Sequence, residues 1–221
     1  MVEIDVSNLK KNTEFLIKNE DALRRQYGKT HSLAVKKLLT ELDAYCCDYI
    51  SRSPFVCLST QHVDGTADVS PRGDPAGFVR VLDANTLAIP DRPGNNRLDS
   101  LSNIITNPSV GLLFIVPGFD DTLRVNGTAF LCQDPDLLAS MTVNNRTPTL
   151  AIVVEVKEAF LHCAKAFRRS RLWHADSRQN RKDLPSLAAM VTEQVSGCAI
   201  EPADAVKLEK DLEEEYRQTM Y

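Results

Sequence analysis

The sequence lacks the short patterns that mark metal sites, disulfide frameworks and the common nucleotide-binding loops. Its 6 cysteines form no C-x-x-C pair, and its 4 histidines form no H-x-x-x-H or H-E-x-x-H pair. We therefore expect no zinc site, and we expect buried thiols rather than disulfide bonds. The patterns G-x-G-x-x-G and G-x-x-x-x-G-K-[ST] are also absent, which excludes the best-known phosphate loops.

Long apolar runs are missing as well. No basic N-terminal stretch leads into an apolar segment, and no uninterrupted apolar run approaches the length of a membrane span. We expect a cytoplasmic protein with no membrane association. The 221 residues, of which 43% are hydrophobic and 25% charged, suffice for a globular core. The formal net charge of -4 argues against a general polyanion binder, although residues 165–182 are basic and residues 201–217 mostly acidic.

The middle of the chain contains runs that are typical of short β-strands, separated by Asp-Gly, Gly-Asp, Asp-Ala-Asn, Pro-Gly and Asp-Asp turns. Seven strands at this spacing predict an antiparallel barrel or sandwich. The runs are residues 54–61, 66–71, 77–83, 86–90, 110–116, 122–132 and 149–163.

Helical periodicity dominates both ends of the chain. Apolar residues recur at helical spacing in residues 8–27 and 32–50, and again in residues 184–195 and 201–221. A short helix is expected at residues 134–138, and residues 165–182 read as a basic loop. We therefore expect an N-terminal helical extension (1–52), a β core (53–175) and a C-terminal helical extension (176–221), forming a single structural domain overall.

The stretch of residues 89–108 predicts an anion site. A strand-like run leads into a polar turn, and a helix-like run follows from Leu98 until Asn107 and Pro108 end it. The unpaired N–H groups and the positive dipole end of a helix's first turn favour a phosphate. An ordinary turn with solvated arginines fits the same spacing, so both interpretations stay open. The candidate donors are Arg92, Asn95, Asn96, Arg97 and Ser100.

A second candidate segment interrupts the second β run at Ser70, Pro71, Arg72 and Gly73. Proline lacks an N–H and glycine lacks a side chain, so this segment ends a strand and leaves backbone groups exposed. Such a strand end can hydrogen-bond the edge of a planar heterocycle, with Arg72 supplying positive charge near the ring. Taken alone, the segment is better explained as a hairpin turn with a surface arginine.

The order of the segments SPRGD, GFVRVLDANTLAIPD, RPGNNRLDSLSNIITNPSVGLLFIVPG and DTLRVNGTAFL resembles the pyridoxamine 5'-phosphate oxidase-like flavoproteins. Residues 162–173, HCAKAFRRSRLW, look like the signature of one subgroup of that superfamily. The resemblance covers residues 54–173 and implies a mainly β protein with flanking helices (α+β). Its core would be an antiparallel Greek-key split barrel that binds FMN.

The resemblance also implies where FMN lies. In that family the cofactor is held at the interface of a homodimer, and the second subunit completes each site. Phosphate or ribityl oxygens would be held by Arg92, Asn96, Arg97 and Ser100, with Asn95 in the same turn. The ring would be lined by Ser70, Pro71, Arg72 and Gly73. The second subunit would supply Lys165 and Arg168, Trp173 as a stacking wall, and Arg124 near the interface.

The implied function is an FMN-dependent oxidoreductase that acts on an unidentified small molecule. The alternative is a non-catalytic flavin- or small-molecule-binding protein, because a fold does not specify a reaction. The phosphate turn lacks the Arg-Lys pair of the true oxidases, and no Arg-x-His motif occurs, so FMN binding is supported better than oxidation of a B6 vitamer. Catalytic residues are not identified, the deazaflavin F420 stays an alternative to FMN, and nucleic-acid binding by residues 165–182 is disfavoured.

Overall fold

The computed structural model describes residues 6–220, except for the side chains of residues 7 and 10, and divides the chain into two compact units, Met1–Leu38 and Leu39–Tyr221. The first unit holds short helices, none of whose described side chains is buried. They are α1 (Val6–Lys11), the 3-10 turn η1 (Thr13–Phe15), α2 (Glu20–Gln26) and α3 (Ser32–Lys36).

The prediction of two long N-terminal helices from periodicity is wrong. The run at residues 8–27 is broken because Asn19 is extended and its side chain accepts a hydrogen bond from Ala22 N, which makes it the cap of a new helix. The run at residues 32–50 is broken because Leu39 leaves the helix and exchanges two backbone hydrogen bonds of 2.9 Å with Ala159. A backbone that pairs with a sheet cannot continue a helix.

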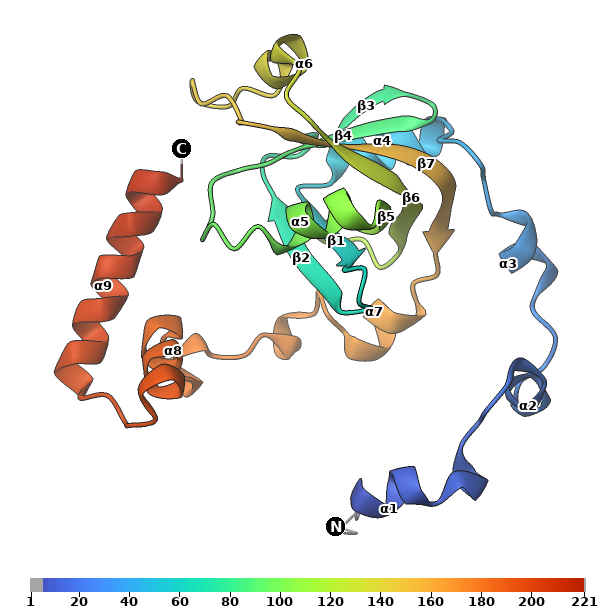
Figure 1. Cartoon of the computed structure of the whole chain (residues 1–221), viewed down its shortest axis with the longest axis horizontal. Helices are drawn as coiled ribbons and strands as arrows, with labels where there is room; N and C mark the ends of the chain where they lie inside the picture. The colour runs from blue at the N-terminus through green and yellow to red at the C-terminus, as the bar shows by residue number, and fades with distance from the viewer. Residues whose placement is uncertain (1–5, 221) are drawn as a thin grey trace. The chain divides into compact units, whose positions relative to one another are not determined.

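The second unit is built on one seven-stranded antiparallel sheet in the order β2-β1-β5-β6-β7-β4-β3, which confirms the predicted fold class (Figure 1). β2 and β3 form its two edges, so the sheet is not closed. The pairings of β1 with β5 and of β4 with β7 are non-local, as in Greek-key folds. The strands are β1 (Phe55–Gln61), β2 (Ala67–Gly73), β3 (Arg80–Asp83), β4 (Thr86–Pro90), β5 (Ser109–Ile115), β6 (Thr122–Cys132) and β7 (Ala151–His162).

Alternation of buried and exposed side chains explains how the sheet encloses its core. In β1, Val56 and Leu58 are fully buried, and in β5 the same holds for Phe114. β6 and β7 shift register between Asn126 and Gly127, where a Cβ atom would press against the carbonyl oxygen of Glu155. Glycine at 127 therefore permits the closest approach of these two long strands.

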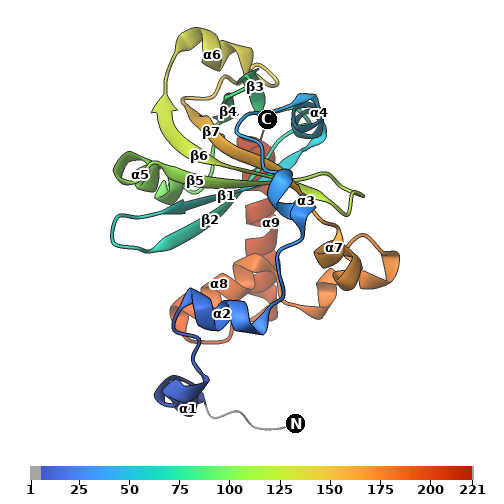
Figure 2. The same ribbon diagram turned by 90° about the vertical axis from the view of Figure 1, so that its right-hand side faces the viewer.

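Helices flank the sheet. α4 (Ala44–Arg52) is capped by Asp43 and buries one face, whereas α5 (Asp99–Thr106) packs against β1 and β2 (Figure 2). The expected helices near residues 134–138, 184–195 and 201–221 are observed, but the basic segment is only partly a loop, because it contains a helix and two 3-10 turns. These elements are α6 (Pro135–Ser140), α7 (Lys165–Ser170), η2 (Ala175–Ser177), η3 (Arg181–Asp183), α8 (Leu187–Ser196) and α9 (Pro202–Thr219). Within residues 6–220, no helix has the length and apolar character needed to cross a membrane.

Candidate functional site

A cavity of about 830 Å³ opens beside β2 and the start of α5. This volume lies within the range of about 300–1,000 Å³ that is typical of sites for small molecules and cofactors. Three segments that are distant in sequence form most of its walls: residues 68–73, residues 90–101 and residues 147–150. Nine of the residues predicted as cofactor-binding line it: Ser70, Pro71, Arg72, Gly73, Arg92, Asn95, Asn96, Arg97 and Ser100.

Successive side chains of β2 lie on opposite faces of the sheet, and this alternation determines which of them are partly buried. Asp68, Ser70 and Arg72 are half-buried on one face, and the residues between them are exposed. Because β2 is an edge strand, it tolerates Pro71, which has no N–H to give to a neighbouring strand. The strand end therefore presents one row of polar side chains to α5 and to the cavity.

Arg72 has a donor that no described group satisfies. Its Nη1 donates to Asp91 Oδ1 at 2.7 Å, and each of the two side chains is 18% exposed. Its Nε is buried, and no atom within the described part of the chain accepts a hydrogen bond from it. Buried polar atoms are nearly always paired, so this donor is an exception that an additional acceptor would satisfy.

Arg92 is tied into the protein framework. Its Nε donates to Asp74 Oδ2 at 2.6 Å and its Nη2 to the carbonyl of Met141 at 2.8 Å. The Asp74 side chain is 0% exposed and that of Arg92 is 14% exposed, so this is a buried ion pair. Arg92 lines the cavity as predicted, but these two bonds give it a role in holding the turn after β4.

Arg97 is the more accessible cation of the turn. Its Nε pairs with Asp99 Oδ2 at 2.8 Å while 73% of its side chain remains exposed. The hydrogen bond with Asp99 raises the pKa of Arg97 above its ordinary value. An exposed pair of this kind contributes little to stability, so another anion can displace the carboxylate at little cost.

The turn itself adopts a strained backbone just before α5. Asn96 and Leu98 have φ angles of 57° and 59°, in the left-handed region. Asparagine tolerates this region, whereas leucine visits it rarely, at a cost of about 1–3 kcal/mol. Leu98 is the N-cap of α5 and forms no side-chain cap, which leaves the first N–H groups of the helix to other acceptors.

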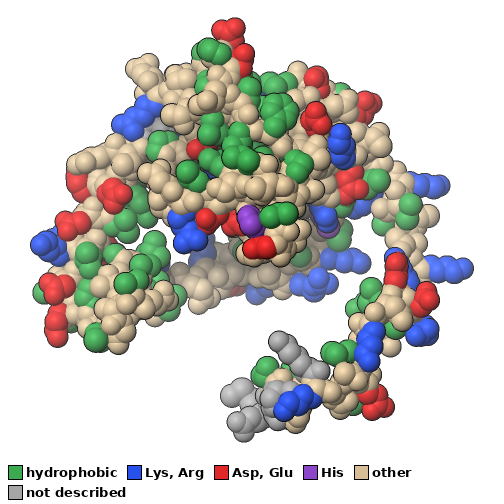
Figure 3. Space-filling view, viewed as in Figure 1, with side chains coloured by type: hydrophobic (Ala, Val, Ile, Leu, Met, Phe, Trp, Pro, Cys, Tyr) green, Lys and Arg blue, Asp and Glu red, His purple; other side chains and the backbone are tan. Residues whose placement is uncertain are grey.

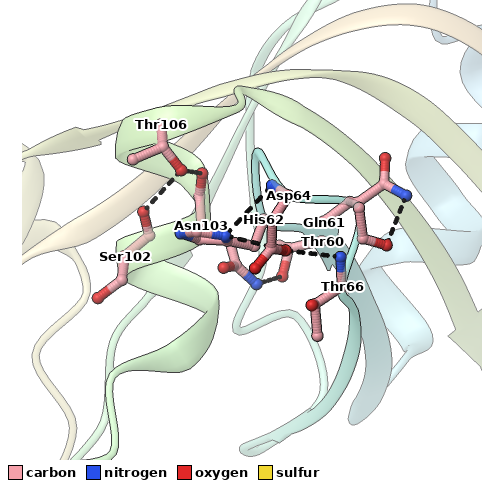
Figure 4. A network of polar contacts seen from close by, with 9 residues as sticks. Thr60, Gln61, His62, Asp64, Thr66, Ser102, Asn103 and Thr106 are labelled. Carbon is pink, nitrogen blue, oxygen red and sulfur yellow. Dashed lines mark hydrogen bonds and ion pairs between the residues drawn. The ribbon is translucent and has the colours of Figure 1, made fainter.

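Ser100 lies at the base of the cavity and is buried, and its hydroxyl donates to Asp68 Oδ2 at 2.7 Å. Asp68 Oδ2 also accepts a bond of 3.3 Å from Thr60 Oγ1. Thr60 in turn accepts a bond of 3.0 Å from Asn103 Nδ2, and Figure 4 shows this link between α5 and β1. The start of α5 is thus fixed to the β1–β2 hairpin by a chain of hydrogen bonds.

Acidic side chains balance the cations of the cavity. Each of its three arginines bonds to an aspartate: Arg72 to Asp91, Arg92 to Asp74 and Arg97 to Asp99. Acidic and basic side chains are likewise interspersed over the face of the molecule seen in Figure 3. The cavity therefore presents individual directed donors and acceptors rather than a broad positive potential.

Lys165, Arg168 and Trp173 do not line the cavity of their own chain. Arg168 pairs with Asp120 at 3.1 Å, and Trp173 donates from Nε1 to the carbonyl of Phe119 at 2.7 Å. Arg124 is also outside, with its guanidinium 5.5 Å from the ring centre of Phe160. Within one protomer, the predicted residues thus fall into two separate groups.

Several residues that line the cavity were not predicted from the sequence. Asp68 could have been found, because it lies two residues before Ser70 on the same face of a predicted strand. The sequence carries no signal for the wall opposite β2, since its approach depends on the long-range pairing of β4 with β7. The missed residues include Phe78, Asp91, Thr147, Pro148, Thr149 and Leu150.

The cysteines and the possible metal ligands were also compared with expectation. In the described range, no group of three or more His, Cys, Asp or Glu side chains is placed to hold a metal ion. None of the six cysteines forms a disulfide, but the expectation of buried thiols is wrong for most of them. Only Cys46 is buried, and Cys163 and Cys198 are exposed.

Comparison with known proteins identifies relatives of the core. A family model described as pyridoxamine 5'-phosphate oxidase matches residues 42–163, more than half of the 221 residues. A search of curated proteins gave no match.

Three solved structures illustrate the similarity. HupZ of Group A Streptococcus is 15% identical over 54% of this chain and 93% of its own, with a TM-score of 0.46. An FMN-binding protein from Syntrophomonas wolfei is 8% identical over 65% of this chain and 96% of its own, with a TM-score of 0.43. A FAD-binding protein from Mycobacterium smegmatis is 19% identical over 56% of this chain and 97% of its own, with a TM-score of 0.39.

Proposed function

This chain belongs to the pyridoxamine 5'-phosphate oxidase family, and from that premise we propose that it binds FMN and acts as an FMN-dependent oxidoreductase on a small molecule. The observation that carries the proposal is the convergence of two predicted segments. Residues 70–73 and residues 92–100 are separate segments of the sequence, and both line the same cavity of about 830 Å³. That volume is sufficient for a flavin nucleotide.

The chain's own residues would bind and orient the cofactor. The buried Nε of Arg72 would donate to an acceptor on the ring, and Arg97 with the first N–H groups of α5 would hold the phosphate. Phe78 and Pro148 would exclude water from the apolar faces of the ring. Bound FMN would supply the electron-accepting ring, so that catalysis requires no side-chain acid or base on the protein.

A test of turnover separates this proposal from its alternative, a flavin- or small-molecule-binding protein without a reaction. The purified protein loaded with FMN is mixed anaerobically with a reduced nicotinamide nucleotide, which donates the hydride, and the flavin absorbance is followed. An oxidoreductase bleaches the flavin and recovers its absorbance on reoxidation. A protein that binds FMN but is never reduced supports the alternative. Titration with F420 in place of FMN tests which of the two flavins is preferred.

We further propose a homodimer in which Lys165, Arg168 and Trp173 reach the cofactor of the partner subunit. Two observations support this arrangement. These residues are outside the cavity of their own chain, and Arg97 is the one cavity arginine whose side chain is largely exposed, so a dianionic phosphate calls for additional cations. The pairing of Arg168 with Asp120 is exposed and can be exchanged for a phosphate at little cost.

Mixing two defective chains tests the shared site. One chain carries Arg97→Ala, and the other carries Lys165→Ala with Arg168→Ala. A shared site regenerates one intact pocket in each heterodimer, so random mixing restores about a quarter of all sites. Sites that are contained in single chains recover no binding, and that result would reject the shared arrangement.

A cytoplasmic location and the absence of nucleic-acid binding, both expected from the sequence, stand as additional proposals. The net charge of -4 opposes binding to a polyanion. Within the basic segment, Arg168 and Arg171 pair with Asp120 and Asp176. Cell fractionation and gel retardation at low salt test these two proposals.

A further inference from the structure

The α6–β7 loop, residues 141–150, forms one wall of the cavity through its second half, residues 147–150. Three hydrogen bonds fix the two ends of this loop to the core. Arg92 Nη2 donates to the carbonyl of Met141 at 2.8 Å, and the backbone N–H of Asp91 donates to that of Leu150 at 3.0 Å. Gln133 Nε2 donates to the carbonyl of Thr149 at 3.1 Å. The middle of the loop extends beyond these three bonds.

This middle part is a tight hairpin that ends at the cavity wall. Arg146 and Val143 exchange two backbone hydrogen bonds of 2.8 and 3.2 Å. The two residues between them, Asn144 and Asn145, have φ angles of 47° and 62°, a left-handed conformation that asparagine tolerates. Arg146 lies outside the cavity lining, but it directly precedes Thr147, which lines the cavity. A displacement of Arg146 is therefore transmitted to the wall.

The side chain of Arg146 contacts the C-terminal end of α9. Its Nη1 donates to the carbonyl of Thr219 at 2.9 Å and its Nη2 to that of Gln218 at 3.2 Å, across 73 and 72 residues of sequence. The last carbonyls of a helix have no partner within the helix, and the negative end of its dipole favours a cation. A residue of the cavity-wall loop thus supplies the C-terminal cap of a distant helix.

Other attachments of α9 are weak. Every side chain of this 18-residue helix is exposed or half-buried. Elements with few buried apolar contacts detach at a low cost in free energy, while the core stays folded. The contact between Arg146 and α9 can therefore form and break without unfolding of the sheet, which gives the cavity wall two states, one with α9 docked and one with α9 released.

We propose that Arg146 is a positioning residue for the cofactor cavity: its contact with the end of α9 holds the α6–β7 loop in the conformation that encloses the ligand. Docking of α9 and binding of the ligand are then energetically coupled, and each favours the other by the same factor. The inference rests on the proposed binding of FMN and deepens it, because the C-terminal helix becomes part of the control of that site.

The coupling is tested with Arg146→Ala. The matched control is Arg181→Ala, because Arg181 is also exposed and donates to two backbone carbonyls, those of Leu184 and Pro185, but lies outside the cavity lining. Hydrogen exchange of the ligand-free proteins reports on the contact itself. In Arg146→Ala, the amides of residues 142–147 and of the last turn of α9 should exchange faster than in the wild type and in the control.

FMN affinity and the rate of FMN release report on the cavity. Arg146→Ala should bind FMN roughly 2- to 30-fold more weakly, as expected for a residue that acts through a coupled element, and should release it faster. Arg181→Ala should match the wild type. Gln218→Pro disrupts the last turn of α9 from the other side of the contact and should have the same effect as Arg146→Ala. Arg146→Lys keeps the charge without the two-pronged geometry, so it should restore part of the affinity.

Reciprocity separates a coupled contact from one that is merely structural. FMN should slow hydrogen exchange in the last turn of α9 of the wild-type protein, and this effect should disappear in Arg146→Ala. An FMN affinity of Arg146→Ala within about twofold of the wild type, or exchange of α9 that does not respond to FMN in the wild type, would overturn the inference and leave flavin binding intact. A wild-type protein that does not bind FMN would instead reject the proposed function, and the coupling with it.

Discussion

The Nε atom of Arg92 and the Oδ2 atom of Asp74 lie 2.6 Å apart in a pair that is largely withdrawn from solvent. Asp74 directly follows β2, and Arg92 belongs to the turn after β4. The pair therefore joins the two segments that form the candidate cofactor site. Arg92, which the sequence suggested as a phosphate ligand, instead fixes the two segments of the site relative to each other.

Replacing Arg92 by alanine should lower the free energy of unfolding of the protein. The change leaves the carboxylate of Asp74 buried without its cation, and breaking a buried pair in this way costs about 3–5 kcal/mol. Urea denaturation of the ligand-free protein measures the loss. Arg52→Ala is the control, since Arg52 pairs with Asp48 on the surface, and its removal should cost about 1 kcal/mol or less. Equal stabilities of the two variants would contradict the framework role of Arg92.

Replacing Arg97 by alanine should weaken FMN binding and leave stability nearly unchanged. A charge-assisted hydrogen bond to phosphate contributes about 1.5 to 3 kcal/mol, so affinity should fall by roughly 10- to 150-fold. Fluorescence titration with FMN provides the measurement, again with Arg52→Ala as the matched surface arginine. Unchanged affinity in the Arg97 variant would remove this residue from the phosphate site.

Replacing Gly127 by alanine should disturb the pairing of β6 with β7. The added Cβ would press against the carbonyl oxygen of Glu155, and strain of this kind typically costs about 1–3 kcal/mol. Gly94→Ala is the control, because nothing lies within 4 Å of a Cβ at that position. Thermal unfolding compares the two. A Gly127 variant as stable as the wild type would show that the strands adjust freely at this position.

Ionisation of Tyr49 should lower the free energy of unfolding at alkaline pH. Burial, with a contribution from the nearby Asp121 carboxylate, raises the pKa of Tyr49 from 10.0 to about 12. The folded state therefore holds this proton more tightly than the unfolded state, so the stability that it contributes is complete below pH 10 and is lost as pH rises toward about 12. Tyr49→Phe should lose this part of the pH dependence, as well as the hydrogen bond of 2.7 Å to the carbonyl of Asp121. Urea unfolding at pH 8 to about pH 12 tests it. Parallel pH profiles of the two proteins would contradict it.

The sheet could be predicted from the sequence because its signals are local. Each of the seven predicted runs overlaps one observed strand, and alternation such as that of Val56 and Leu58 marks the inward face. The N-terminal helices could not be predicted, because their boundaries depend on competing partners. Asn19 caps a new helix, and Leu39 pairs its backbone with Ala159 in β7. Helical periodicity contains no information on that pairing.

The candidate site was predictable in composition but not in the roles of its residues. Polar residues near Gly73 and Gly94 indicated a ligand, and they do line one cavity. Whether an arginine faces a ligand or a carboxylate depends on residues that are distant in sequence, as with Arg92 and Asp74. The same holds for the direction of the Ser100 hydroxyl, which is fixed by Asp68 across α5 and β2. These hydrogen-bond partners can be identified only from the three-dimensional arrangement of the strands.

Titration of the purified wild-type chain with FMN, followed by flavin fluorescence and by the mass of the complex, tests the central claim most directly. The account predicts saturable binding of one FMN per chain, with the Arg97→Ala variant roughly 10- to 150-fold weaker. Absence of saturable FMN binding by the wild-type protein would contradict it.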